Sequence, residues 1–215
     1  MFDAAIVVAD PLRPVVSLGV LVVEGARTFQ NQEPLDSAIR EAENRVRSQE
    51  GMANLQATRA MYRQTGLDPT RRRPSSEALL RRVLRGENLP RVNTAVDVCN
   101  WCSLEFQVPY GLYDLDRVEP PVHLRIGEKG EQYVGIRKDV VHVEGRMTLA
   151  DRIGPFGNPS ADSARTMVTD ATSNLLVVIF VPAQVRRQVL QPAIEATSAR
   201  LALFTGGRET LRAVA

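Results

Sequence analysis

The segment from residue 92 to residue 106 constrains the fold more than any other part of this sequence. Its spacing predicts a helix with apolar residues around nearly the whole circumference, and such a helix is buried in the protein interior. Three polar residues, Asn93, Asp97 and Asn100, recur at i, i+4 and i+7 and therefore share one narrow stripe of this helix. A buried amide or carboxylate without a partner costs about 1–3 kcal/mol. The stripe is therefore expected either to tie neighbouring loops to the core or to line a ligand pocket.

Helical and strand-like segments occur in blocks around this helix. Pro74 precedes one predicted helix and Gly86 follows it, whereas a loop rich in glycine and proline covers 154–160. Blocks, as opposed to strict alternation, predict an α+β fold. The predicted strands are 4–8, 15–23, 122–126, 131–136, 140–144 and 175–181, and the predicted helices are 34–65 with a break near Gly51 and an end at Gly66, 75–86, 92–106 and 183–204.

Several kinds of site are excluded by what the sequence lacks. Cys99 and Cys102 form a CxxC in the middle of the apolar helix, where core packing is favoured over redox chemistry. His123 and His142 fit no common zinc spacing. The sequence has no Walker loop, dinucleotide fingerprint or GxSxG elbow, so we expect neither a metal nor a cofactor.

The N-terminus does not have the pattern of a signal peptide, because Asp3 stands where a basic region is expected. The longest apolar run, 175–181, is too short to span a bilayer. These features predict a cytoplasmic protein with no membrane partner.

The formal charge of the 215-residue chain is only +2, but basic residues are concentrated in one segment. Residues 71–91 contain seven arginines and two glutamates, a balance of +5 that leaves −3 for the rest. Such a patch suits a phosphate backbone, although a solvated helix face would have the same composition. A second polar segment, 162–166, precedes the predicted strand 175–181 and is compatible with either a binding site or turn capping.

Several segments of the chain, in a fixed order, resemble a known protein family. The sequences RPSSEALLRR at 73–82, LPRVN at 89–93, VDVCN at 96–100 and PYGLYDLD at 109–116 resemble the B3/B4 family in the expected order. The later segments DSART at 162–166 and TDATSN at 169–174 resemble it as well. This family comprises stand-alone relatives of the editing domain in the β subunit of phenylalanyl-tRNA synthetase. The resemblance covers about 71–181, and we expect one B3/B4-like domain over 1–215 with a mixed β-sheet core flanked by helices.

The resemblance implies hydrolysis of an amino acid wrongly esterified to tRNA, acting in trans. Stand-alone relatives include deacylases that remove the arginine analogue canavanine, whose cationic side chain Asp97 or Asp162 could bind. Where synthetase domains carry a histidine, this sequence has Gly111, which is a departure from their pattern at the substrate site. The expected catalytic residues are Asn93, Asp97 and Asn100; the expected substrate-binding residues are Gly111, Asp162, Ser163, Arg165 and Thr166; the expected tRNA-binding residues are Arg71, Arg72, Arg73, Arg81, Arg82 and Arg85.

Two other functions remain open at the level of sequence. The first is a non-catalytic tRNA- or ligand-binding module, and the second is a small-molecule hydrolase with no RNA partner. The sequence does not fix the oligomeric state, for which a monomer is the favoured expectation. On the editing hypothesis, alanine at Asn93 and Asp97 is expected to abolish deacylation while leaving the fold intact.

Overall fold

The computed structural model describes residues 6–30, 33–48, 54–137 and 139–215. The expected break near Gly51 and the start of the run 4–8 lie outside the described residues. The helices are α1 (Glu33–Ser48), α2 (Leu55–Gln64), α3 (Ser75–Leu84), α4 (Thr94–Phe106) and α5 (Arg186–Thr205). The strands are β1 (Val7–Val8), β2 (Val16–Glu24), β3 (Tyr110–Asp114), β4 (His123–Ile126), β5 (Gln132–Val134), β6 (Val140–His142), β7 (Met147–Ala150), β8 (Pro155–Asn158), β9 (Ala161–Asp162), β10 (Leu175–Pro182) and β11 (Arg208–Val214).

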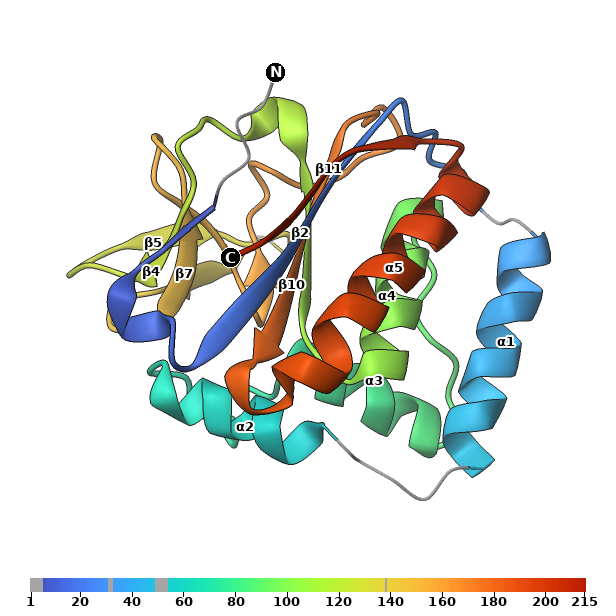
Figure 1. Ribbon diagram of the computed structural model, residues 1–215, viewed down its shortest axis with the longest axis horizontal. Helices are drawn as coiled ribbons and strands as arrows, with labels where there is room; N and C mark the ends of the chain where they lie inside the picture. Colours follow the sequence, from blue (N-terminus) through green and yellow to red (C-terminus); the bar gives the residue numbers. More distant parts are fainter. Residues whose placement is uncertain (1–5, 31–32, 49–53, 138) are drawn as a thin grey trace.

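A four-stranded antiparallel sheet in the order β11-β2-β10-β3 forms the centre of the fold. Every residue of β10 is buried, and β2 is buried up to its last residue. A strand that is apolar throughout needs cover on both of its faces. The central sheet has that cover, because helices pack on one face and a second sheet packs on the other (Figure 1).

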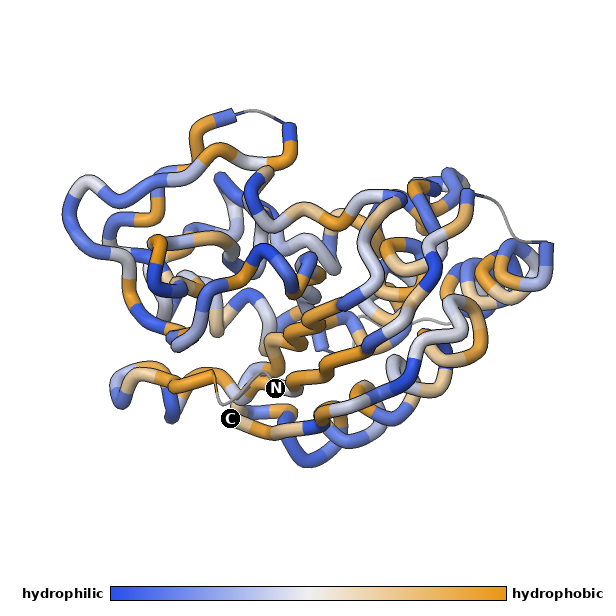
Figure 2. Tube along the Cα trace, turned by 90° about the horizontal axis from the view of Figure 1, so that it is seen from above, coloured by the Kyte–Doolittle hydropathy of each residue, from blue (hydrophilic) through white to orange (hydrophobic). Residues whose placement is uncertain are grey.

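Alternate residues of the central strands contribute to two different cores. Val177 and Ile179 face the core that includes α1, α3, α4 and α5. Val178 and Phe180 face the core formed with α2 and the five-stranded sheet β1-β4-β7-β8-β9. This division follows from the period of two along a strand. Figure 2 shows runs of hydrophobic residues passing through the middle of the molecule, with hydrophilic segments toward its outside.

The helix α4 is buried, as its sequence predicts, and it packs against α1, α3, α5 and strand β3. Its N-terminus is capped by Asn93, whose side chain accepts a hydrogen bond from the Val96 amide. Within the described residues, no helix is both long enough and apolar enough to cross a bilayer.

The hairpin of β5 and β6 projects beside the five-stranded sheet and is attached to β9. The Ile136 amide donates to the Asp162 carbonyl at 3.1 Å, and the Ala164 amide donates to the Val134 carbonyl at 2.8 Å. These bonds fix the hairpin next to the segment that follows β8, and the space between them and α3 contains the cavities described below.

The α+β prediction is confirmed, and the predicted buried strand at 175–181 and C-terminal helix correspond to β10 and α5. The prediction of a loop at 154–160 is wrong. The glycine- and proline-rich stretch 154–160 contains β8, because Pro155 stands at the first position of the strand, where proline is tolerated. The chain also continues past α5 into β11, which pairs with the edge of β2.

Candidate functional site

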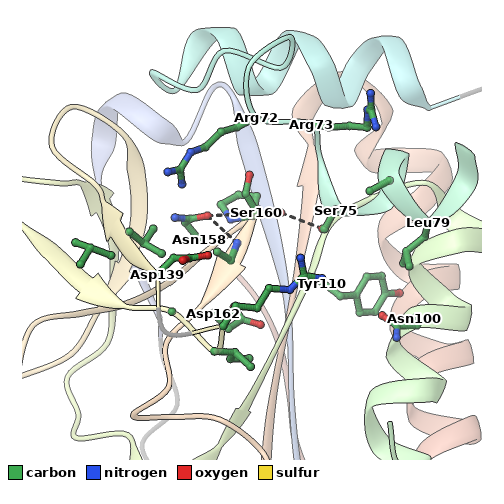
Figure 3. A pocket seen from close by; sticks show the side chains of 18 residues that line it. Arg72, Arg73, Ser75, Leu79, Asn100, Tyr110, Asp139, Asn158, Ser160 and Asp162 are labelled. Atoms are coloured by element: carbon green, nitrogen blue, oxygen red, sulfur yellow. Dashed lines mark hydrogen bonds between the residues drawn. The ribbon is translucent and has the colours of Figure 1, made fainter. Parts of the chain in front are cut away.

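Two adjoining cavities lie between α3, α4, the β5–β6 hairpin and the turn from β8 to β9 (Figure 3). Their volumes are about 630 Å³ and about 220 Å³. They form one site with an outer and an inner compartment, because six residues line both: Ser75, Leu79, Asn100, Tyr110, Ile136 and Asp162.

The outer compartment is cationic and polar. Arg72, Arg73 and Arg137 line it, together with Asp139 and the polar turn that contains Asn158. Arg72 and Arg137 make no ion pair within the described part of the chain, whereas Arg73 lies 3.8 Å from Glu77. Figure 3 shows the side chains of Arg72 and Arg73 pointing in different directions. Arg72 and Arg137 are therefore the arginines available to an anionic ligand in this compartment.

The inner compartment is mainly apolar. Val96, Cys99, Leu112, Met167 and Val168 form much of its wall. Burial raises the pKa of the Cys99 and Cys102 thiols, so both are protonated and packed in the interior, as the mid-helix position of the CxxC predicts. A lining of this kind accommodates an uncharged side chain better than a charged one.

Asp162 is the acidic residue at the junction of the two compartments. Burial of the carboxyl group raises its pKa to about 7, and the nearby Tyr113 hydroxyl group and Leu112 amide reduce this effect. The group therefore exchanges a proton near neutral pH, which is the property required of a general base. Asp162, which the sequence leads us to expect as a substrate-binding residue, lines both compartments.

Gly111 does not line either compartment. An added Cβ at this residue would lie 2.2 Å from the Tyr113 hydroxyl oxygen. The space that a side chain at residue 111 would need is filled by the Tyr113 side chain, so the departure at Gly111 is matched by local packing.

Asn93 and Asp97 do not line the pocket, which corrects the sequence-based expectation for two of the three stripe residues. Asn93 caps α4. Asp97 accepts hydrogen bonds from the Arg91 side chain at 2.8 Å and from the Val92 amide at 2.9 Å. Asn93 thus caps the helix, Asp97 holds the loop before it, and of the three stripe residues only Asn100 reaches the cavity.

The other expected substrate-binding residues also have structural contacts. Arg165 forms a bidentate ion pair with Asp151, with both distances 2.9 Å. Ser163 and Thr166 hydrogen-bond to each other through their hydroxyl groups at 2.9 Å and are buried. The placement of these three side chains in the pocket wall is therefore wrong, and their contacts shape the turn after Asp162.

Several arginines of the basic segment are paired with glutamates. Buried Glu77 accepts hydrogen bonds from Arg59 at 2.7 and 2.8 Å and from Arg81 at 2.7 Å. Arg82 and Arg85 both pair with Glu87, and Arg71 lies 3.7 Å from Asp68. This pairing reduces the charge available to a ligand from the +5 segment.

Three residues at or near the cavity, Arg137, Tyr110 and Tyr113, are not among the site residues expected from the sequence. Arg137 follows β5 on an exposed hairpin and carries no motif that marks it. Tyr110 lines both compartments and hydrogen-bonds through its hydroxyl group to Thr197 of α5 at 3.1 Å. The segment PYGLYDLD at 109–116, which contains both tyrosines, is the sequence signal that could have indicated their roles. Within the described ranges, His, Cys, Asp and Glu side chains form no group of three that could hold a metal ion.

Two curated relatives are β subunits of phenylalanine–tRNA ligase. The protein of Streptomyces avermitilis is 27% identical over 118 residues, which cover 54% of this chain and 14% of the relative. That of Fusobacterium nucleatum subsp. nucleatum is 26% identical over 135 residues, covering 59% of this chain and 15% of the relative. The matched region therefore spans about one seventh of the length of these relatives.

The fold also resembles a solved structure, the N-terminal fragment of the phenylalanyl-tRNA synthetase β subunit from Pyrococcus horikoshii. The TM-score is 0.53 with 15% sequence identity, over 99% of this chain and 54% of that one. A family model described as the B3/4 domain matches residues 57–202, which include the helices and strands that form both compartments. Because the match extends over more than half of the chain, the chain belongs to the B3/4 domain family.

Proposed function

We propose that this protein hydrolyses the ester bond of mischarged aminoacyl-tRNA in the two-compartment cavity. The observation that carries the proposal is the position of Asp162 between a cationic outer compartment and an apolar inner one. The relation to phenylalanine–tRNA ligase β subunits supports an aminoacyl-tRNA as the substrate. The outer compartment would bind the acceptor end and the inner one the amino acid side chain.

In this proposal Asp162 activates the attacking water. Its carboxylate takes one proton, the water oxygen bonds to the ester carbonyl carbon, and the bond from that carbon to the ribose oxygen then breaks. The proton passes to the leaving ribose hydroxyl, and the products are the free amino acid and the tRNA. A positioned general base contributes about 10²–10⁴-fold to such a rate.

Asn100 is placed to stabilise the developing oxyanion. Its side chain lines both compartments and makes no hydrogen bond within the described residues. The amide is therefore free to donate to the ester carbonyl oxygen as negative charge develops there. Removing one donor of this kind typically costs about 10²–10³-fold in rate.

The test is a panel of tRNAs charged with non-cognate amino acids, including arginine tRNA carrying canavanine. Hydrolysis and binding are measured in parallel on each substrate. The mainly apolar inner compartment favours an uncharged amino acid, whereas Asp162 is the group that could bind the canavanine side chain. Binding without hydrolysis across the panel would contradict the proposal and support a non-catalytic tRNA-binding module.

Replacing Arg72 with alanine is expected to weaken tRNA binding uniformly and to reduce the slope of log K against log salt by about 1. The reason is that Arg72 lines the outer compartment without an ion pair among the described residues. The measurement is tRNA affinity at several salt concentrations. Arg82→Ala is the matched control, because Arg82 is already paired with Glu87 and does not line the cavity. Equal slopes for both variants would contradict this assignment.

A further inference from the structure

The Tyr113 hydroxyl group is a buried polar group without a conventional partner. Its oxygen makes no hydrogen bond of normal geometry to the described residues, and the same is true of Asp162 Oδ1. Two orphaned polar atoms in one interior region are unusual, because each costs about 1–3 kcal/mol when it is left unsatisfied. The two groups lie close together, because the hydroxyl group lies against Gly157, and Gly157 is the cross-strand partner of Asp162 in the β8–β9 pair. At this position the Tyr113 hydroxyl lowers the pKa of Asp162, and Asp162 raises that of Tyr113.

Two glycines make room for this hydroxyl group. A Cβ added at Gly111 would lie 2.2 Å from the hydroxyl oxygen, and one added at Gly157 would lie 2.3 Å from it. Gly111 is on β3 and Gly157 is on β8, so the hydroxyl lies between two strands of different sheets. The Tyr113 ring is fixed by an edge-on contact with Phe156, whose ring centroid is 4.9 Å away at an interplanar angle of 86°.

Tyr113 does not line either compartment, whereas Asp162 lines both. The tyrosine thus approaches the carboxyl group from the core side. Since Oδ1 is buried without a hydrogen-bond partner among the described residues, a water or a substrate in the cavity approaches the carboxyl group at Oδ2.

We propose that Tyr113 is a positioning residue that holds the Asp162 carboxyl group with one oxygen toward the cavity. The inference rests on the proposed function for its effect on catalysis. It goes beyond that function by naming a residue outside the cavity that controls the proposed base, and by giving a physical reason for glycine at 111 and 157.

The other titratable groups that face Asp162 are neutral near pH 7. They are Tyr62 of α2, Tyr133 of β5 and Cys99 of α4, and burial raises the pKa of each. The charged residues that share the outer compartment are Arg72, Arg73, Arg137 and Asp139. The pKa of Asp162, about 7, lies in the neutral range, so its carboxyl carbon is expected to titrate near pH 7.

The test is Tyr113→Phe, which removes the hydroxyl group and keeps the ring against Phe156. Two readouts are needed: the pH dependence of deacylation, corrected for spontaneous hydrolysis, and the titration of the Asp162 carboxyl carbon by NMR. We expect kcat to fall about 10-fold with little change in KM, which is less than the roughly 10²-fold cost of a catalytic group misplaced by about 1 Å, because the Asp162 carboxyl group itself is retained. Because the hydroxyl lowers the pKa of Asp162, its loss should move the acid limb and the NMR midpoint to higher pH.

Tyr62→Phe is the matched control. It removes another buried hydroxyl group, one that donates to the Pro159 carbonyl at 2.6 Å, and should leave the titration midpoint of Asp162 unchanged. Equal midpoints in the wild type and in Tyr113→Phe would overturn the inference. A wild-type protein that hydrolyses no substrate of the panel would overturn the proposed function, and the NMR titration would still decide the coupling of Tyr113 to Asp162.

Discussion

Replacing Asp162 with asparagine is expected to lower the rate of deacylation about 100-fold, the lower end of the range for loss of a general base. Asparagine has nearly the same shape but cannot accept a proton from water at neutral pH. The wild-type rate should rise with pH through about 7 and then level off, because the ionised form is the active one. In the variant this limb should disappear, and both effects are measured on the best substrate of the panel.

The same substitution is expected to stabilise the fold above pH 7. The pKa of Asp162 is about 7 in the folded protein and near 3.8 when it is unperturbed. Below about pH 4 the group is protonated in both states and imposes no penalty. As the pH rises from 4 to 7 the unfolded chain ionises first, so the wild type loses stability over this window. Above pH 7 the asparagine variant is therefore expected to exceed the wild type in free energy of unfolding by at most about 4 kcal/mol.

Denaturant unfolding of both proteins at pH 4 and pH 8 measures this effect on stability. Asp10→Asn is the control, because Asp10 is 93% exposed in a surface ion pair with Arg13 and such pairs contribute little. An Asp162→Asn variant that is fully active, or less stable than the wild type at pH 8, would contradict the assignment of Asp162 as a buried base. Loss of activity with a gain in stability is the pattern typical of functional residues.

Asp97→Ala is expected to lower the free energy of unfolding by about 3 kcal/mol. The side chain is only 2% exposed, and removing it leaves the Val92 amide without an acceptor and Arg91 with Asp36 as its remaining ion-pair partner. Removing one partner of a buried ion pair typically costs about 3–5 kcal/mol, and partial exposure of Arg91 places this case at the lower end. A loss of stability in Asp97→Ala would contradict the expectation from the sequence that alanine at this residue leaves the fold intact.

Asn100→Ala is the matched comparison, since Asn100 lies on the same stripe of α4. Its side chain lines the cavity and makes no hydrogen bond within the described residues, so its loss should change stability by less than about 0.5 kcal/mol. Deacylation should fall instead. Denaturant unfolding and single-turnover deacylation of both variants separate the two roles, and similar unfolding free energies for the two variants would contradict the division of the stripe.

The local charge pattern of the arginines in 71–85 predicts a basic surface but not which arginines are paired in the fold. The pattern predicts a basic surface, and Arg72 does line the outer compartment. It cannot show that Glu77 is buried between Arg59 and Arg81, because Arg59 comes from α2, a different helix. Nor can it place Arg137, which reaches the same compartment from a hairpin more than 60 positions along the chain.

The sequence by itself determined the elements and the family. The continuous apolar runs of β2 and β10, the nearly continuous apolar surface of α4 and the ordered segments from 73 to 174 are properties of the local residue order. Helix and strand periodicities are enough to assign such elements, and blocks of them are enough to predict an α+β fold.

Only the tertiary structure decided which polar residues belong to the site. Asn93, Asp97 and Asn100 lie on one stripe of a helical wheel, but Asn93 caps α4, Asp97 holds the loop before α4 and Asn100 meets the cavity. Asp162 and Tyr113 are 49 positions apart and come together because β9 and β3 are neighbours in space. The pKa of a carboxyl group depends on its burial and on such distant neighbours, so the property that makes Asp162 a candidate base arises only when the chain is folded.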